Sequence, residues 1–190
     1  MRDDDVVELK DKSMDVDMAS WVHVMPIWPE ATGGDVDPGM SFCYDIVMIR
    51  LGAEWLSINH PDAGVRETIL AKVLGQDPYH ETRGKPIRKM DMIEGRSVKA
   101  WRPAKLRGRI EQTVDILIGK YFEGLHEKYP GSGSRPVAPE IVARFRPCVI
   151  SFFLHWLWNN FPNTKAVDRA ADTYLQEDPL LMERCGAGNL

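Results

Sequence analysis

Cysteine is scarce in this sequence, and the few cysteines present lie far apart. The 190 residues contain three, namely Cys43, Cys148 and Cys185. Their number is odd and no two of them form a Cys-x-x-Cys pair, so the pattern predicts neither a disulfide framework nor a structural zinc site. We expect free, mostly buried thiols and an intracellular location in a reducing compartment, which is either the cytoplasm or the inside of an assembled particle or complex.

Two kinds of hydrophobic segment are also missing. The first residues, Met1-Arg2-Asp3-Asp4-Asp5, are acidic and no apolar run follows them, so the sequence predicts no secretory signal. The longest apolar stretch, residues 148–161, is interrupted by four polar residues, Ser151, His155, Asn159 and Asn160. Crossing a bilayer takes about 20 apolar residues. We therefore expect a buried helix here and no transmembrane segment.

The common motifs of catalysis and nucleotide binding are absent from the sequence. It contains no Gly-x-Ser-x-Gly, no Walker loop and no Gly-x-Gly-x-x-Gly. No pair of its five histidines has the spacing of a zinc-binding helix; these are His23, His60, His80, His126 and His155. The sequence therefore predicts no metal, no cofactor and no catalytic residues.

What the sequence does have is charge of opposite sign in separate regions. Residues 1–45 carry eleven Asp or Glu against three Lys or Arg, a balance of -8. Residues 83–109 carry ten Lys or Arg against Asp91 and Glu94, a balance of +8, although the net charge of the whole chain is only -4. A basic block of this density attracts polyanions or acidic protein surfaces.

The part of the basic block around Trp101 is the candidate binding surface. Arginine suits phosphates and carboxylates, and an indole can stack on a base or on a guanidinium. The residues concerned are Arg96, Lys99, Trp101, Arg102, Lys105, Arg107 and Arg109. Three interpretations remain open: self-assembly or co-assembly, nucleic-acid contact, and a plain solvated surface. The sequence pI of about 5.7 disfavours a dedicated nucleic-acid binder.

The amino-terminal part of the chain has two candidate strands. Residues 42–51 are rich in β-forming side chains, with Asp45 and Arg50 near the ends of the run. Gly52-Ala53-Glu54 follows as a turn candidate, and residues 55–58 form a second apolar run. These features predict a small antiparallel β-sheet or hairpin.

The remainder of the sequence favours helices. Asp62 is a helix cap before residues 63–74, and apolar residues spaced by three and four predict a long helix over 103–129. Pro139 opens another helix, which Pro147 restarts or kinks, and a last helix begins after Asn163 or Thr164 and reaches about Glu177. The predicted fold is therefore α+β, with a small amino-terminal antiparallel sheet or hairpin followed by a mainly helical bundle. The predicted organisation is an acidic flexible arm (1–19), a single globular domain (20–180) and a carboxy-terminal tail (181–190).

One short motif resembles a known enzyme family. Residues 75–80, Gly-Gln-Asp-Pro-Tyr-His, are similar to the water-activating loop of family 1 uracil-DNA glycosylases. The resemblance implies that Asp77 helps to activate water against a flipped uridine and that Tyr79 excludes larger bases. It covers six of the 190 residues. The same residues are also typical of a helix end followed by an Asp-Pro turn.

These patterns lead to three functional hypotheses. The first is a non-enzymatic structural subunit of a larger assembly, such as a virion or a multi-subunit complex. It would dock on protein subunits, its own copies or others, through the acidic arm and the basic segment 83–109. The alternative is a nucleic-acid-binding module that uses the basic segment and Trp101. A remote alternative, suggested only by residues 75–80, is a uracil-DNA glycosylase-like enzyme.

Overall fold

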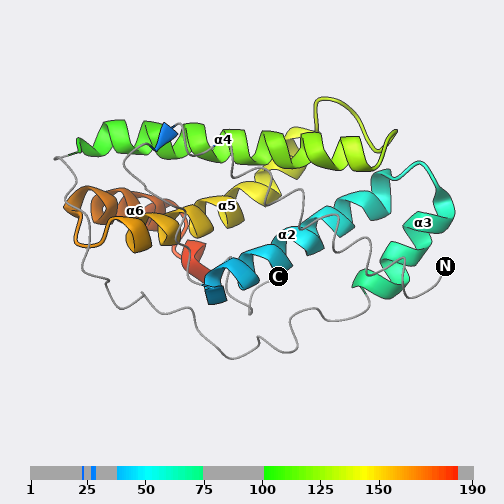
Figure 1. Ribbon diagram of the computed structural model, residues 1–190, viewed down its shortest axis with the longest axis horizontal. Coiled ribbons are helices and arrows are strands. Elements are labelled where there is room, and N and C mark those ends of the chain that lie inside the picture. The colour runs from blue at the N-terminus through cyan, green and yellow to red at the C-terminus, as the bar shows by residue number, and fades with distance from the viewer. Residues whose placement is uncertain (1–22, 24–26, 29–37, 75–100, 184–190) are drawn as a thin grey trace.

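The computed structural model describes residues 23, 27–28, 38–74 and 101–183, and all the regular structure in these ranges is helical (Figure 1). The elements are α2 (Pro38–Asn59), α3 (Ala63–Thr68), the π-helix η2 (Ile69–Leu74), α4 (Pro103–Lys128), α5 (Pro139–Asn160), α6 (Lys165–Glu177) and the 3₁₀ turn η3 (Leu181–Glu183). No strand occurs within these described ranges. The prediction of an α+β fold is therefore wrong, because this part of the chain is mainly helical.

Both segments predicted to be strands lie in the single helix α2. Residues 42–51 and 55–58 fall between its first residue, Pro38, and its last, Asn59. The buried residues of α2 recur at helical spacing, and they include Tyr44, Val47, Met48, Leu51, Trp55 and Leu56. β-branched and aromatic residues only weakly favour strands, and burial of a helical stripe against other elements overrides that preference.

Gly52 marks a close approach of α2 to α4, where the sequence suggested a turn. A β-carbon at Gly52 would lie 2.4 Å from the hydroxyl oxygen of Tyr121 on α4. That hydroxyl donates a hydrogen bond of 2.8 Å to the main-chain oxygen of Met48. Glycine is therefore required here because the tyrosine passes across the backbone of α2 at this residue.

The helix predicted over residues 63–74 is present, and Asp62 caps it as expected. Oδ1 of Asp62 accepts hydrogen bonds from the main-chain nitrogens of Gly64 at 2.7 Å and Val65 at 3.2 Å. The segment begins as α3 and continues as the π-helix η2. Its predicted carboxy-terminal cap, Gly75, lies outside the described residues.

The long helix predicted from Pro103 is confirmed as α4. Pro103 stands in its first turn, where a missing main-chain N–H costs nothing. Every apolar residue of the predicted stripe is buried: Leu106, Ile110, Val114, Leu117, Ile118, Tyr121, Phe122 and Leu125. This stripe holds α4 against the rest of the molecule.

Helix α5 is continuous through Pro147, where the sequence suggested a restart or a kink. Proline removes the hydrogen bond to the carbonyl four residues earlier, which belongs to Ala143. Ala143 is exposed, so water can hydrate that carbonyl. Beyond the proline, all residues from Cys148 to Leu157 are buried, which confirms that the apolar stretch is a buried helix.

The last long helix, α6, begins after Thr164 and ends at Glu177, as predicted. Its buried stripe consists of small residues and one tyrosine, namely Ala166, Val167, Ala170, Ala171 and Tyr174. The turn η3 follows, and its Leu181 is buried. The predicted acidic arm (1–19) and the last seven residues of the predicted tail lie outside the described residues.

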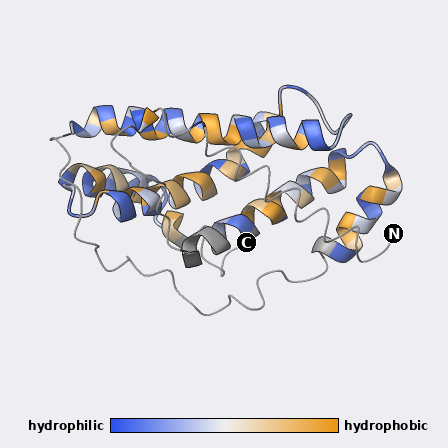
Figure 2. Cartoon of the chain, in the orientation of Figure 1, coloured by the Kyte–Doolittle hydropathy of each residue, from blue (hydrophilic) through white to orange (hydrophobic). Residues whose placement is uncertain are grey.

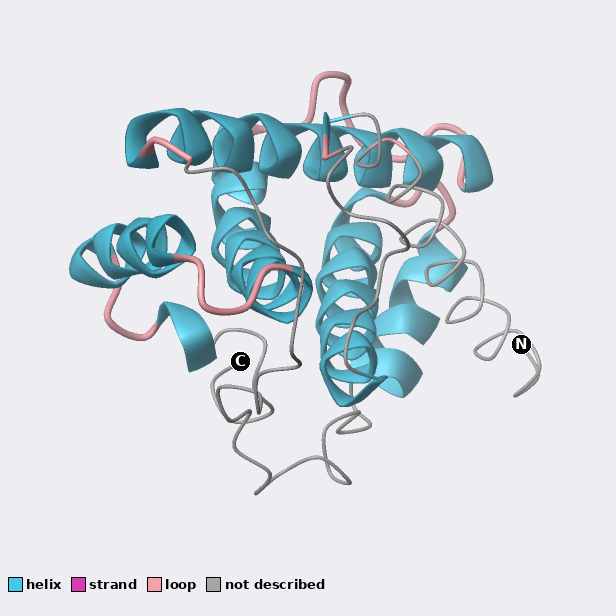
Figure 3. Ribbon diagram, turned by 60° about the vertical axis from the view of Figure 1, so that its left-hand side comes forward, coloured by secondary structure: helices cyan, strands magenta, loops and turns pink. Residues whose placement is uncertain are grey.

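Helix α4 lies across one side of the molecule, with the other long helices beneath it. Figures 1 and 3 show this arrangement from two directions. Helix α5 contacts α2, α4, α6 and η3, so it occupies the centre. Hydrophilic and hydrophobic residues alternate along α4 in Figure 2, which is the pattern of a helix with one buried and one outer face.

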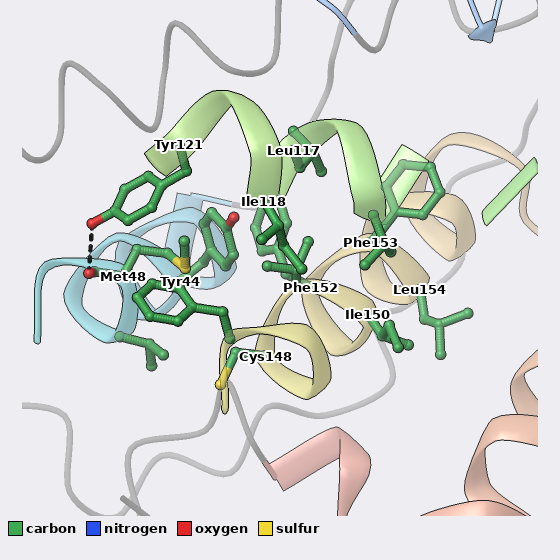
Figure 4. Close-up of a cluster of buried hydrophobic side chains, with 14 of the residues drawn as sticks. Tyr44, Met48, Leu117, Ile118, Tyr121, Cys148, Ile150, Phe152, Phe153 and Leu154 are labelled. Atoms are coloured by element: carbon green, nitrogen blue, oxygen red, sulfur yellow. Dashed lines mark hydrogen bonds between the residues drawn. The ribbon is translucent and has the colours of Figure 1, made fainter. Parts of the chain in front are cut away.

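Part of the core between α2, α4 and α5 is drawn in Figure 4. The ring of Tyr44 on α2 stacks on that of Phe152 on α5 with centroids 4.0 Å apart. Tyr121 and Leu117 face this layer from α4, and Cys148 lies in it as a buried free thiol. The three helices therefore share one apolar interior.

Candidate functional site

The aromatic member of the predicted patch, Trp101, is packed into an aromatic cluster. Its ring centroid lies 5.7 Å from that of Trp28 and 4.9 Å from that of Phe161, with edge-to-face geometry in both cases. Trp101 is half-buried and rests against the core. Its indole therefore closes the core at the start of α4 and does not form an open platform for stacking.

Arg109 is held at the same cluster. Its guanidinium lies 4.0 Å from the ring centroid of Trp28 and 5.4 Å from that of Trp101. Nη2 also donates a hydrogen bond of 2.5 Å to the main-chain oxygen of Ile27. Cation–π contact and this hydrogen bond fix the arginine on α4, so its charge serves the fold.

Trp28 is the centre of the arrangement, and sequence reasoning did not assign it that role. It is fully buried. Its Nε1 donates to Oγ1 of Thr113 at 2.8 Å, and that hydroxyl donates to the main-chain oxygen of Arg109 at 2.8 Å. Thr113 interrupts the apolar stripe of α4, which is the only sign of this bond in the sequence. The tryptophan thus ties residues 27–28 to the middle of α4.

Arg107 pairs with helix α6. Its Nη2 donates to both carboxylate oxygens of Glu177 at 2.8 Å. Its guanidinium carbon lies 4.9 Å from the ring centroid of Tyr174. The hydrogen bond to Glu177 raises the pKa of Arg107, although burial opposes this slightly. This second arginine of the predicted patch is therefore also occupied within the chain.

A polar network next to this pair joins α4, α5 and α6. Arg146 on α5 donates to Glu111 and, at 2.5 Å, to Oδ1 of Asp115. Glu111 also accepts a hydrogen bond from the hydroxyl of Tyr174. Burial and the bond to Glu111 raise the pKa of Tyr174, so this hydroxyl stays protonated at neutral pH. The network fixes the relative positions of three helices.

Sequence reasoning missed this network, although part of the signal was present. Glu111 and Asp115 are four residues apart, so they lie on one side of a helix. The cation that meets them, Arg146, comes 31 residues after Asp115 and from a different helix. A local pattern does not reveal a partner at that distance.

The two remaining described cations of the patch are free. The side chains of Arg102 and Lys105 are exposed, and neither side chain makes an ion pair or hydrogen bond within residues 23, 27–28, 38–74 and 101–183. The last two predicted members, Arg96 and Lys99, lie outside the described residues. The structure therefore divides the predicted patch into occupied side chains (Trp101, Arg107 and Arg109) and free ones (Arg102 and Lys105).

The free cations belong to a stripe along the outer face of α4, which we call the outer stripe. Its members are all exposed: Arg102, Lys105, Gly108, Gln112, Gly119, Glu123 and Glu127. The stripe has cations at the start of the helix and carboxylates at its end. Glu127 makes no ion pair within the described part of the chain, and Glu123 pairs with Lys120 at 2.6 Å on the same helix.

Two glycines lie in the middle of the outer stripe. No atom lies within 4 Å of a β-carbon built at Gly108 or at Gly119. Glycine inside a helix lowers stability by about 1 kcal/mol relative to alanine. Unlike Gly52, these two glycines meet no described neighbour that requires them.

At the far end of α4, a buried histidine lies beneath the loop that leads to α5. His126 is 5% exposed, and its ring meets that of Trp55 edge-to-face at 5.1 Å. Neither its Nε2 nor Oγ of the buried Ser132 has a hydrogen-bond partner among the described residues. Burial, followed by the charge of Arg135, lowers the pKa of His126. This histidine is a core residue.

Two further sequence features bear on chemistry. The described residues contain no group of three or more His, Cys, Asp or Glu placed to hold a metal ion. The hexapeptide that resembles the glycosylase loop, with Asp77 and Tyr79, lies outside the described residues. The segment directly before it, η2, is helical.

None of the described helices combines the length and the apolar character that crossing a bilayer requires. Comparison with known proteins gives no match: no protein-family model, no curated protein and no solved structure resembles the chain significantly.

Proposed function

We propose that this chain is a non-enzymatic subunit of a larger assembly and that it docks on acidic protein surfaces through its basic segment. The described part of that segment is the start of α4. The acidic arm, residues 1–19, is the proposed counterpart that docks on basic surfaces of neighbouring subunits. Such a component suits a virion or another multi-subunit particle.

The observation that carries the proposal is the difference between the cations at the start of α4. Arg107 and Arg109 are taken up by Glu177, Trp28 and Ile27. Arg102 and Lys105 are exposed and have no partner in the described part of the chain. Two adjacent free cations at one end of a helix offer carboxylates of another subunit a place to bind.

The packing of Trp101 favours a protein partner over nucleic acid. A tryptophan that binds single-stranded nucleic acid needs an open ring face for stacking. Here the indole is half-buried, with its ring against Trp28 and Phe161. A partner that is nucleic acid would show itself as a change of mass on addition of a short nucleic acid.

The proposal is tested by the solution mass from light scattering at about 0.05 M and about 0.5 M salt. We expect the mass to exceed the chain mass of 21.6 kDa at low salt and to fall towards it at high salt. A mass that grows only when a short nucleic acid is added would replace the proposal by the binding module. A mass that stays at that of the monomer at both salt concentrations, with and without nucleic acid, would contradict self-assembly.

Deletion of residues 1–19 tests the arm separately. The deletion removes seven acidic residues and three basic ones. We expect smaller assemblies at low salt and a weaker dependence on salt. Unchanged size and unchanged salt dependence would remove the arm from the proposal and leave the start of α4 as the docking element.

A further inference from the structure

We propose that the partner docked on the outer stripe of α4 is a second copy of this chain, with the two α4 helices antiparallel about a two-fold axis. This inference rests on the proposed assembly function and names the partner of the same surface. It is carried by the charge pattern of the stripe, which is complementary to itself when one helix is reversed.

The self-complementarity follows from residue positions. In an antiparallel pair of α4 helices with the two-fold axis near residue 114, two residues lie opposite each other when their residue numbers add to about 228. Lys105 then lies opposite Glu123 of the second copy, and Arg102 lies opposite Glu127. Each pair occurs twice, because a two-fold interface repeats every contact. A parallel arrangement would instead place Arg102 and Lys105 against their own copies.

The positions around the helix agree with this pairing. Each residue turns the helix by about 100°, from 3.6 residues per turn. Lys105 and Glu123 are 18 residues apart, which is five whole turns, so both point in the same direction from α4. Arg102 and Glu127 lie 25 residues apart, close to seven turns, and therefore also share one direction. All four side chains are exposed.

The glycines of the outer stripe fit the same arrangement. Gly108 of one copy comes opposite Gly119 of the other, since their numbers add to 227. A β-carbon at either position would have no neighbour within 4 Å in the single chain. Two helix backbones can approach closely where glycines face each other. The pairing thus gives a role to two glycines that the fold of one chain does not use.

The described long helices leave the outer stripe uncovered. Each of them lies beneath α4 in both views of the molecule, and only the loop that leads to α5 rises above the carboxy-terminal part of α4 among the described residues (Figures 1 and 3). Exposed ion pairs contribute little each and weaken with salt. We therefore expect a salt-sensitive dimer with a dissociation constant well above that of an obligate dimer, whose interface would be larger and more apolar.

Charge reversal tests the pairing by sedimentation velocity at low salt. Lys105→Glu places two glutamates opposite each other, and Glu123→Lys places two lysines opposite each other, so each variant should dimerise at least tenfold more weakly. The double variant Lys105→Glu/Glu123→Lys restores opposite charges and should recover the dimer. Lys165→Glu, an exposed lysine on α6, is the matched control and should leave the mass unchanged.

A second variant tests the glycines without relying on charge. Gly119→Leu adds a side chain into open space in the single chain, so the thermal unfolding of the monomer should not be impaired. The same side chain would keep two paired helices apart, and the dimer should weaken at least tenfold.

The outcomes separate the two proposals. Salt-sensitive assembly that none of the α4 variants alters would overturn the antiparallel pairing and leave the assembly function standing. A wild-type protein that remains at 21.6 kDa at low salt and submillimolar concentration would overturn both self-association and this pairing. If each single charge reversal weakened dimerisation and the double variant recovered it, the pairing would be established.

Discussion

Two cations one turn apart on helix α4 are used in opposite ways. Arg109 lies against the rings of Trp28 and Trp101. Lys105 is exposed and has no ion partner within the described residues. Arg109 stabilises the fold, whereas Lys105 remains available to a partner. A charge in a basic block is therefore a binding residue only if the fold leaves it unused.

The largest effect should come from removing Trp28, the ring against which Arg109 and Trp101 pack. Trp28→Ala takes away a fully buried indole, its bond to Thr113 and its contact with Arg109. We expect the free energy of unfolding to fall by about 3–5 kcal/mol. The measurement is denaturant unfolding, with Ile58→Ala as control because Ile58 is 70% exposed. Equal and small losses would show that Trp28 is not central to the core.

The glycines give the next comparison. Gly52→Ala introduces a β-carbon 2.4 Å from the hydroxyl oxygen of Tyr121, so we expect a loss of about 1–3 kcal/mol. Gly108→Ala enters open space on an exposed helix and should raise stability by up to about 1 kcal/mol. Thermal or denaturant unfolding of the two variants measures the contrast. If both substitutions changed the stability in the same direction, the contrast between the packed Gly52 and the exposed Gly108 would be contradicted.

The two cations provide a smaller but more specific contrast. Arg109→Ala loses a cation–π contact and the hydrogen bond to Ile27, for an expected loss of about 1–2 kcal/mol. Lys105→Ala should change stability by less than about 0.5 kcal/mol, as for a surface substitution. The assembly measured by light scattering should respond the other way: Lys105→Ala should weaken assembly, and Arg109→Ala should not. A variant of Arg109 that folds well but fails to assemble would argue against this division.

The smallest effect is a dependence of stability on pH at the far end of α4. Burial lowers the pKa of His126 below its ordinary value of about 6.5 in the folded protein. As the pH falls below that value, the unfolded chain binds a proton that the folded chain does not, so stability decreases. Unfolding of the wild type at pH 8 and pH 5.5 should show this loss, and His126→Gln should show less of it. An identical pH dependence in both proteins would assign the loss to other groups.

Much of the helical part of the fold could be predicted from the sequence because its signals are local. Asp62 at a helix start, Pro103 in a first turn, and the apolar stripe of α4 each act within a few residues. The prediction failed at α2, where β-forming residues at positions 42–51 also satisfy helical spacing. The choice between strand and helix there depends on Tyr121 and Phe152, which come from other helices.

The candidate site was predictable only in outline for the same reason. The sequence predicted a binding surface in the basic segment around Trp101 but could not rank its cations. Arg107 is occupied by Glu177, 70 residues later, and Arg109 by Ile27, 82 residues earlier. No local pattern distinguishes them from Arg102 and Lys105, which lie within the same eight residues. Long-range contacts alone decide which charges reach the surface unpaired.

The most direct test of the antiparallel pairing mixes two variants that should each remain monomeric. Lys105→Glu has glutamate at both positions, 105 and 123, and Glu123→Lys has lysine at both. In a mixed dimer each glutamate at position 105 or 123 meets a lysine of the other variant. Equal amounts of the two proteins should therefore give twice the chain mass of 21.6 kDa in light scattering at low salt. A mixture that remains at the single-chain mass, although the wild type dimerises, would contradict the account.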